Sequence, residues 1–197
     1  MGRSAVEVRR VEGDLRGPFI DLWVAHRIES GTTPDAARRL AADGTLSAAL
    51  DRSDICAFIA HVDGTPAGYV VVTDSTRSPL VDAPCVSISM LHVLPDHRRQ
   101  GVAAALLART VRYADQVGAV HVASLVPAHD RESNRFFARI GFAPETVRRV
   151  TSVATLQRRL AGERSSRRPV AQVLQRRRDL RARARSASPR GSSVGLG

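Results

Sequence analysis

The feature that most constrains the fold is an apolar run that leads through a basic, glycine-containing turn into an alanine-rich segment. The apolar run covers residues 86–94, the turn reads Arg-Arg-Gln-Gly-Val-Ala over residues 98–103, and the segment rich in alanine and leucine continues to Ala114. This order predicts a strand, a turn and a helix, and it leaves free backbone N–H groups and the positive end of the helix dipole pointing outward together. We therefore expect an anion site, and the expected ligand is a cofactor that carries a diphosphate.

Each residue type in this turn suits such a site. Gly101 lets the backbone approach a phosphate closely, and the small side chain of Ala103 takes up little space in the first helical turn. Arg98 and Arg99 add fixed positive charge. The hexapeptide alone is a weak indication, because an ordinary helix with a basic first turn has the same appearance. The strand before it and the helix after it give the pattern its weight.

The periodicity of the rest of the chain predicts a mixed α/β domain. Alternating or continuous apolar runs predict strands over residues 5–11, 55–61, 66–73, 85–94, 120–126, 142–150 and 152–156. Helical spacing predicts helices over residues 18–30, 33–50 with Gly44 as an interruption, 103 to about 117, and 130–140. An antiparallel meander that runs into two strand–helix units implies a mixed sheet with helices on both faces.

Charge divides the chain into two parts. The 197 residues include thirty arginines and no lysine, and ten of the arginines fall within residues 162–197 against Glu163 and Asp179. Size and composition favour one globular domain over residues 1–161, followed by an Arg- and Ser-rich tail over residues 162–197 that we expect to be disordered. The tail is either a solvated segment or a contact for a polyanion such as nucleic acid or the ribosome.

Several classes of protein are disfavoured by what the sequence lacks. It contains no run of about 18 apolar residues, so no transmembrane helix is expected. Its first residues carry charges where a secretion signal would be apolar, so the cytoplasm is the expected location. Cys56 and Cys85 lie within strand-like runs, which favours buried thiols over a disulfide or a metal site. No bound metal is expected.

Three blocks of sequence, in this order, carry a family resemblance. Leu91-His92-Val93-Leu94-Pro95 precedes the basic turn, Ser133-Asn134 follows at the spacing of one further strand and helix, and residues 135–142 read Arg-Phe-Phe-Ala-Arg-Ile-Gly-Phe. In this combination the chain resembles the GNAT superfamily of N-acetyltransferases over roughly residues 5–160.

The resemblance implies a single GNAT-like domain whose fourth and fifth strands splay apart, with acetyl-CoA as the acyl-donor substrate. In such a domain the diphosphate lies on the basic turn, and the pantetheine arm bonds to the backbone where the strands part. The residues implied to contact the donor are Leu91, His92, Val93, Arg98, Arg99, Gln100, Gly101, Val102, Ala103 and Asn134.

The implied reaction is direct attack of an uncharged primary amine on the thioester within a ternary complex. The amine belongs to a small molecule, a peptide N-terminus or a protein lysine. The enzyme needs a group that takes the ammonium proton, donors for the oxyanion and a proton for the departing thiolate. His92 is the candidate base, Ser133 is a candidate acid, and a backbone N–H near Leu91 or His92 is the expected oxyanion donor. Alternative proton acceptors, acting through water, are Glu29, Asp74 and Asp82.

Two departures from the family pattern keep a second interpretation open. The family often places a glutamate base on the fourth strand, where this chain has Ser87, which is not a base. Phe137 stands where the family commonly has a tyrosine that protonates the thiolate, and phenylalanine has no proton to donate. The alternative function is therefore a CoA-binding regulatory protein with little turnover. Phe19 and Trp23 are candidates for the acceptor pocket or for the core, and a homodimer is the assembly that the resemblance favours.

Overall fold

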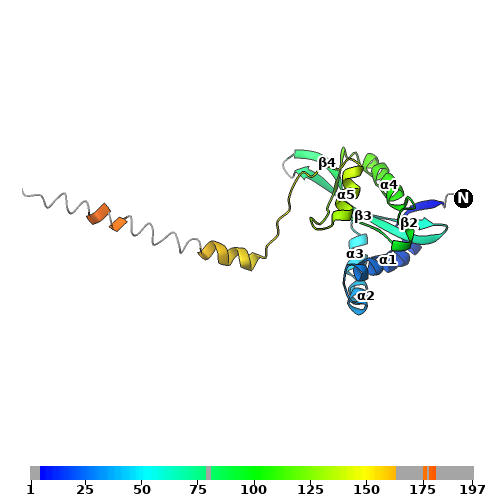
Figure 1. Cartoon of the computed structure of the whole chain (residues 1–197), viewed down its shortest axis with the longest axis horizontal. Helices are drawn as coiled ribbons and strands as arrows, with labels where there is room; N and C mark the ends of the chain where they lie inside the picture. The colour runs from blue at the N-terminus through cyan, green and yellow to red at the C-terminus, as the bar shows by residue number, and fades with distance from the viewer. Residues whose placement is uncertain (1–4, 79–80, 163–174, 177, 181–197) are drawn as a thin grey trace, which may run out of the picture. The chain divides into compact units, whose positions relative to one another are not determined.

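The structure is a computed structural model that describes residues 5–78, 81–162, 175–176 and 178–180 (Figure 1). Contacts within the backbone divide the chain into two units, residues 1–143 and 144–197. The predicted disorder of residues 162–197 concerns a segment that lies almost entirely outside the described residues.

The first unit is built on a five-stranded sheet with the order β1-β2-β3-β4-β5. The strands are β1 (Val6–Arg10), β2 (Ile55–Val62), β3 (Thr65–Ser78), β4 (Val81–Val93) and β5 (His121–Ser124). β1 to β4 pair antiparallel, and β5 pairs parallel with β4. The predicted mixed sheet is confirmed, and β3 and β4 extend further along the chain than the alternation of residues predicted.

Helices cover both faces of this sheet, as predicted. They are α1 (Arg16–Glu29), α2 (Pro34–Ala42), α3 (Thr45–Leu50), α4 (Val102–Gln116) and α5 (Arg131–Arg139), with short 3-10 turns η1 (Gly13–Leu15) and η2 (Pro95–His97). Figure 1 shows α4 and α5 on one side of the strands and α1, α2 and α3 on the other. Gly44, with φ of 83°, separates α2 from α3 because an α-helix cannot continue through a left-handed residue.

Two apolar clusters hold the layers together. On one face, Val102 and Leu106 of α4 pack with Phe137 of α5 against alternate residues of β2, β3 and β4. On the other face, Phe19 and Leu22 of α1 pack against the opposite side chains of β2 and β3. Successive strand residues point to opposite faces, so β2 and β3 supply side chains to both clusters.

The two predicted final strands are wrong. Residues 142–150 have no regular secondary structure, and residues 153–162 are helical. The alternation of apolar residues that suggested a strand leaves Val147 and Val150 about four-fifths exposed, at 76% and 82%. This helix begins at residue 153, and Ser152 is its N-cap residue, because the Ser152 hydroxyl accepts a hydrogen bond from the N–H of Thr155 at 3.1 Å.

Gly68 allows β3 and β4 to approach closely, and its replacement is our first prediction. A Cβ on Gly68 would lie 2.6 Å from the carbonyl oxygen of His92 and 3.1 Å from the Cα of Val93. We expect Gly68→Ala to lower the free energy of unfolding by about 2 kcal/mol, measured by chemical denaturation, because backbone atoms must move. Gly17→Ala in α1, where a Cβ meets nothing within 4 Å, is the control and should change stability by less than about 1 kcal/mol. Equal effects of the two substitutions would contradict this account.

Candidate functional site

The basic turn between β4 and α4 has a fixed backbone with two left-handed residues. Arg99 has φ of 61° and Gly101, the residue before α4, has φ of 85°. The Gln100 side-chain amide donates to the carbonyl of Asp96 at 2.8 Å, and the buried Val102 anchors the first helical turn in the core. The first N–H groups of a helix have no partner within it, and alternating backbone conformations of this kind gather N–H groups into an anion-binding concavity.

The strand that leads into this turn separates from its neighbour as predicted. β4 pairs with β5 only between Cys85–Ile88 and His121–Ser124, and the N–H of Leu125 donates to the carbonyl of Ile88 at 3.1 Å. Within the described part of the chain, residues 90–93 of β4 pair with β3 alone. Their other edge, beside the basic turn, therefore pairs with no strand among the described residues.

His92 lies on the α1 side of β4 within a cluster of polar rings. The residue is 7% exposed, and its ring stacks on that of His26 of α1 with centroids 4.3 Å apart and an interplanar angle of 7°. Tyr69 of β3, which pairs with His92 across the sheet, hydrogen-bonds through its hydroxyl to Nδ1 of His26 at 2.6 Å. The stacking and the hydrogen bond fix the orientation of both imidazoles.

A carboxylate and a guanidinium complete this cluster. Oε2 of Glu29, at the end of α1, lies 3.6 Å from Nε2 of His92, and Oε1 of Glu29 forms an ion pair and hydrogen bond with Arg98. The Nε of Arg98 also donates to the carbonyl of Val93 at 3.2 Å. Arg98 therefore connects the basic turn to the same carboxylate that faces His92. We call His26, Glu29, Tyr69, His92 and Arg98 the histidine cluster.

Burial keeps the rings of this cluster uncharged near neutral pH. Desolvation, with the nearby His26 as a smaller cause, lowers the pKa of His92 to about 4, although Glu29 opposes the shift. Desolvation also lowers the pKa of His26 and raises the pKa of Tyr69. His92 is consequently a neutral imidazole at pH 7, which is able to accept a proton.

The sequence matches that of a known family. Residues 20–142 match the family model described as the acetyltransferase (GNAT) family. The chain belongs to the GNAT family. An uncharacterized N-acetyltransferase of Methanocaldococcus jannaschii is 28% identical over 90 residues, which span 46% of this chain and 40% of that protein. The match thus covers less than half the length of that relative.

Solved structures of N-acetyltransferases share the fold. A ribosomal-protein-alanine N-acetyltransferase from Brucella melitensis biovar Abortus 2308 is 20% identical, with a TM-score of 0.62 over 75% of this chain and 99% of that one. An aminoglycoside N-acetyltransferase solved with CoA is 25% identical, with a TM-score of 0.58 over 76% of this chain and 94% of that one. The predicted family is confirmed, and with it an N-acetyltransferase type of fold.

The predicted residues on α5 serve the structure of this GNAT domain. The N–H of Ser133 donates to Asp130, the N-cap residue, at 3.0 Å, and the amide of Asn134 donates to the carbonyl of Pro127 at 3.0 Å. Phe137 is 7% exposed and makes edge contacts with Phe136 and Phe142. Phe137, where the resemblance led us to expect a tyrosine, is therefore a core residue. Roles of Ser133 and Asn134 in binding or catalysis remain predictions.

The candidates Asp74, Phe19 and Trp23 lie outside the histidine cluster. Asp74, expected in a loop, lies in β3 and accepts hydrogen bonds at 3.0 Å from the hydroxyl of Tyr113. Phe19 is fully buried and packs on Tyr69 with ring centroids 5.1 Å apart, so it belongs to the core. Trp23 packs partly against the apolar cluster that contains Phe19, and the guanidinium of Arg27 lies over the Trp23 ring.

The described residues contain no group of three metal-binding side chains and no helix long and apolar enough to cross a membrane.

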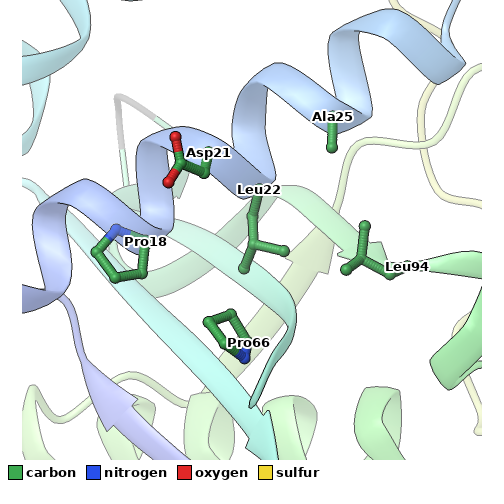
Figure 2. Close-up of a pocket in the computed structure, with 6 residues that line it drawn as sticks. All are labelled: Pro18, Asp21, Leu22, Ala25, Pro66 and Leu94. Atoms are coloured by element: carbon green, nitrogen blue, oxygen red, sulfur yellow. The ribbon is translucent and has the colours of Figure 1, made fainter.

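An apolar hollow lies on the same face, along α1. It measures about 360 Å³ and is lined by Pro18, Asp21, Leu22, Ala25, Pro66 and Leu94. Figure 2 shows Leu22 projecting from α1 toward Pro66 at the start of β3 and Leu94 just after β4. The hollow thus borders the end of the strand that carries His92.

Sequence reasoning did not single out His26 and Tyr69 as site residues. His26 falls within the helix predicted over residues 18–30, and Tyr69 falls within the strand predicted over residues 66–73. The register of β3 and β4 places Tyr69 opposite His92, and the packing of α1 places His26 on the same ring; the spacing of residues gives no signal of either.

The buried, uncharged His92 makes stability depend on pH, which is our second prediction. Its pKa is lowered from 6.5 to about 4, so the unfolded chain binds a proton in this range before the folded chain does. Stability linked to His92 is therefore present above about pH 6.5 and is lost as the pH falls toward 4. Between pH 7.5 and 4.5, we expect the wild type to lose about 2 kcal/mol more unfolding free energy than His92→Gln, measured in urea. Parallel losses in the two proteins would contradict the burial of a neutral imidazole.

Proposed function

We propose that the protein transfers an acetyl group from acetyl-CoA to a primary amine by direct attack of the amine on the thioester. The observation that carries the proposal is the buried His92, on the strand that parts from β5 and ends in the basic turn. Membership of the GNAT family and a fold neighbour solved with CoA support it.

The donor site is proposed along the free edge of β4 and over the turn that follows. Nothing lies within 4 Å of where a Cβ of Gly101 would stand, so the backbone is open to a phosphate at that point. The N–H groups of Gly101, Val102 and Ala103 are the proposed diphosphate donors, with charge from Arg98 and Arg99. The backbone of residues 91–93 is proposed to bond the pantetheine arm, and Asn134 and Gln100 to border the donor.

His92 is the proposed base. The acceptor arrives as an ammonium ion, His92 takes one proton from it, and the free amine nitrogen then attacks the thioester carbon. A backbone N–H near Leu91 or His92 would stabilise the oxyanion. The carbon–sulfur bond then breaks, and the thiolate takes a proton from Ser133 or from water, because Phe137 has none to give.

The acceptor is proposed to bind on the α1 side of the sheet, where the histidine cluster and the apolar hollow lie. The named relatives act on very different amines, a ribosomal-protein alanine in one case and an aminoglycoside in the other. For this chain we propose the class of primary amines, which includes small molecules, peptide N-termini and lysine side chains.

Release of free thiol from acetyl-CoA in the presence of a panel of amines tests this function. We expect amine-dependent thiol release with at least one acceptor, and one new acetyl group on that acceptor for each thiol.

The core position of Phe137 favours the second candidate, a CoA-binding regulatory protein. Saturable CoA binding without turnover on any amine would establish that second candidate and reject the enzyme.

The distribution of charge favours an additional role for the second unit as a polyanion contact. Residues 144–197 hold fourteen arginines against three acidic residues, whereas residues 1–143 hold sixteen of each. The whole net charge of +11 therefore lies in the second unit, and we propose that it binds nucleic-acid phosphates. Binding to an RNA oligonucleotide should weaken steeply with salt and should be lost without residues 162–197. Unchanged binding after that deletion would reject the proposal.

A further inference from the structure

The carboxylate of Glu29 is shared between the basic turn and the candidate base. One oxygen pairs with Arg98 of the turn, and the other lies 3.6 Å from Nε2 of His92. Nε2 of His92 is buried and makes no hydrogen bond in the described structure. Glu29 is thus the anionic group nearest to the unsatisfied atom of the imidazole, but its charge is neutralised by an arginine.

We propose that Arg98 exchanges Glu29 for a phosphate oxygen of the acyl donor, and that the released carboxylate then acts as the partner of His92. This inference rests on the proposed function, because it takes the basic turn as the donor's phosphate site. Glu29 becomes a positioning residue that strengthens the base only when the donor is present.

The exchange is chemically reasonable for both partners of Arg98. The side chains of Arg98 and Glu29 are 42% and 39% exposed, and ion pairs this open to water contribute little to stability. A diphosphate carries more negative charge than a carboxylate and presents several acceptor oxygens to a planar guanidinium. Arg98 therefore loses one weak ion pair and gains a stronger one.

The groups that face His92 determine what the exchange does to it. They are His26 and Glu29 of α1, Tyr69 of β3 and Arg98 of the turn. His26 and Arg98 disfavour a positive charge on His92, and Glu29 favours one. When Arg98 turns to the phosphate, the carboxylate is left to stabilise protonated His92, so its affinity for a proton rises.

The functional consequence is an order of events. Before the donor binds, the His92 imidazole is a weak base and deprotonates only a small fraction of the ammonium groups that reach it. After the donor binds, the same ring accepts the ammonium proton through one nitrogen while Nε2 faces the free carboxylate. The reactive amine is thus produced when the thioester is in place.

A histidine NMR titration of the full chain, with and without saturating CoA, tests the coupling. Ring-carbon labelling gives six histidine signals, and His92 is assigned by the signal missing from His92→Gln. We expect CoA to raise the pKa of His92 by about one unit, a tenfold gain in proton affinity. In Glu29→Gln, CoA should bind and the rise should vanish. In Arg98→Gln, the pKa should already be raised without CoA.

Arg99→Gln is the matched control for Arg98→Gln, because it removes the same charge from the same turn and leaves the Glu29 pair intact. It should weaken CoA binding and, at saturation, keep the rise in the His92 pKa. An unchanged or lowered His92 pKa in CoA-bound wild type would overturn this inference alone. A rise that persists in Glu29→Gln would also overturn it, since the donor's own charge would then be the cause. Failure of CoA to bind would overturn the inference together with the proposed function.

Discussion

Gly101→Val is expected to lower the affinity for CoA by about 100-fold or more. Gly101 has φ of 85°, a conformation that β-branched residues strongly disfavour, and its missing side chain leaves the turn open where a phosphate is proposed to lie. A valine side chain would occupy the space of the ligand and shift the first N–H groups of α4 away from it. Isothermal titration with CoA measures the loss directly.

Gly118→Val separates this effect from backbone strain. Gly118 follows the other end of α4, has φ of 70°, and likewise has nothing within 4 Å of a Cβ position. Both substitutions should therefore destabilise the fold by similar amounts, about 1–3 kcal/mol, while only the one at Gly101 affects CoA. Equal CoA affinity in the two variants would show that the diphosphate lies elsewhere.

His92→Gln is expected to reduce kcat by about 10²- to 10⁴-fold, with the KM for acetyl-CoA changed by less than about threefold. Glutamine keeps a polar side chain of similar length but accepts no proton at neutral pH. Because the proposed role of His92 is in proton transfer, the loss should appear in turnover rather than in donor binding. Steady-state rates with an acceptor identified from the amine panel provide the measurement.

His61→Gln is the control for this substitution. His61 is the other strongly buried histidine of the sheet among the described residues, at 9% exposure, and it lies in β2. If both variants lost turnover equally, the effect of His92→Gln would come from the packing of the sheet and not from catalysis.

The strand–turn–helix element was predictable because its signals are local. A continuous apolar run, a glycine at the turn and an alanine-rich segment each report on a few neighbouring residues, and β4 and α4 follow them. The alternation around Val147 and Val150 is equally local, yet no strand forms there. A strand needs a partner, and the sequence around a segment does not say whether a neighbour will supply one.

The histidine cluster was not predictable for a related reason. His92 was a candidate from its place before the basic turn, but its surroundings depend on two long-range facts. The register of β3 and β4 places Tyr69 opposite His92, and the packing of α1 brings His26 and Glu29 over the same ring. Neither register nor helix packing can be read from the spacing of residues, so the burial and the lowered pKa of His92 appear only in the folded chain.

The proposed function places the acyl donor on the basic turn and the free edge of β4, next to His92. A crystal structure of the full chain with CoA is the decisive measurement. We expect diphosphate oxygens within hydrogen-bonding distance of the N–H groups of residues 101–103, and the thiol end of the pantetheine arm beside residues 91–93. A diphosphate bound away from the turn, or a pantetheine arm that leaves the edge of β4 free, would contradict it.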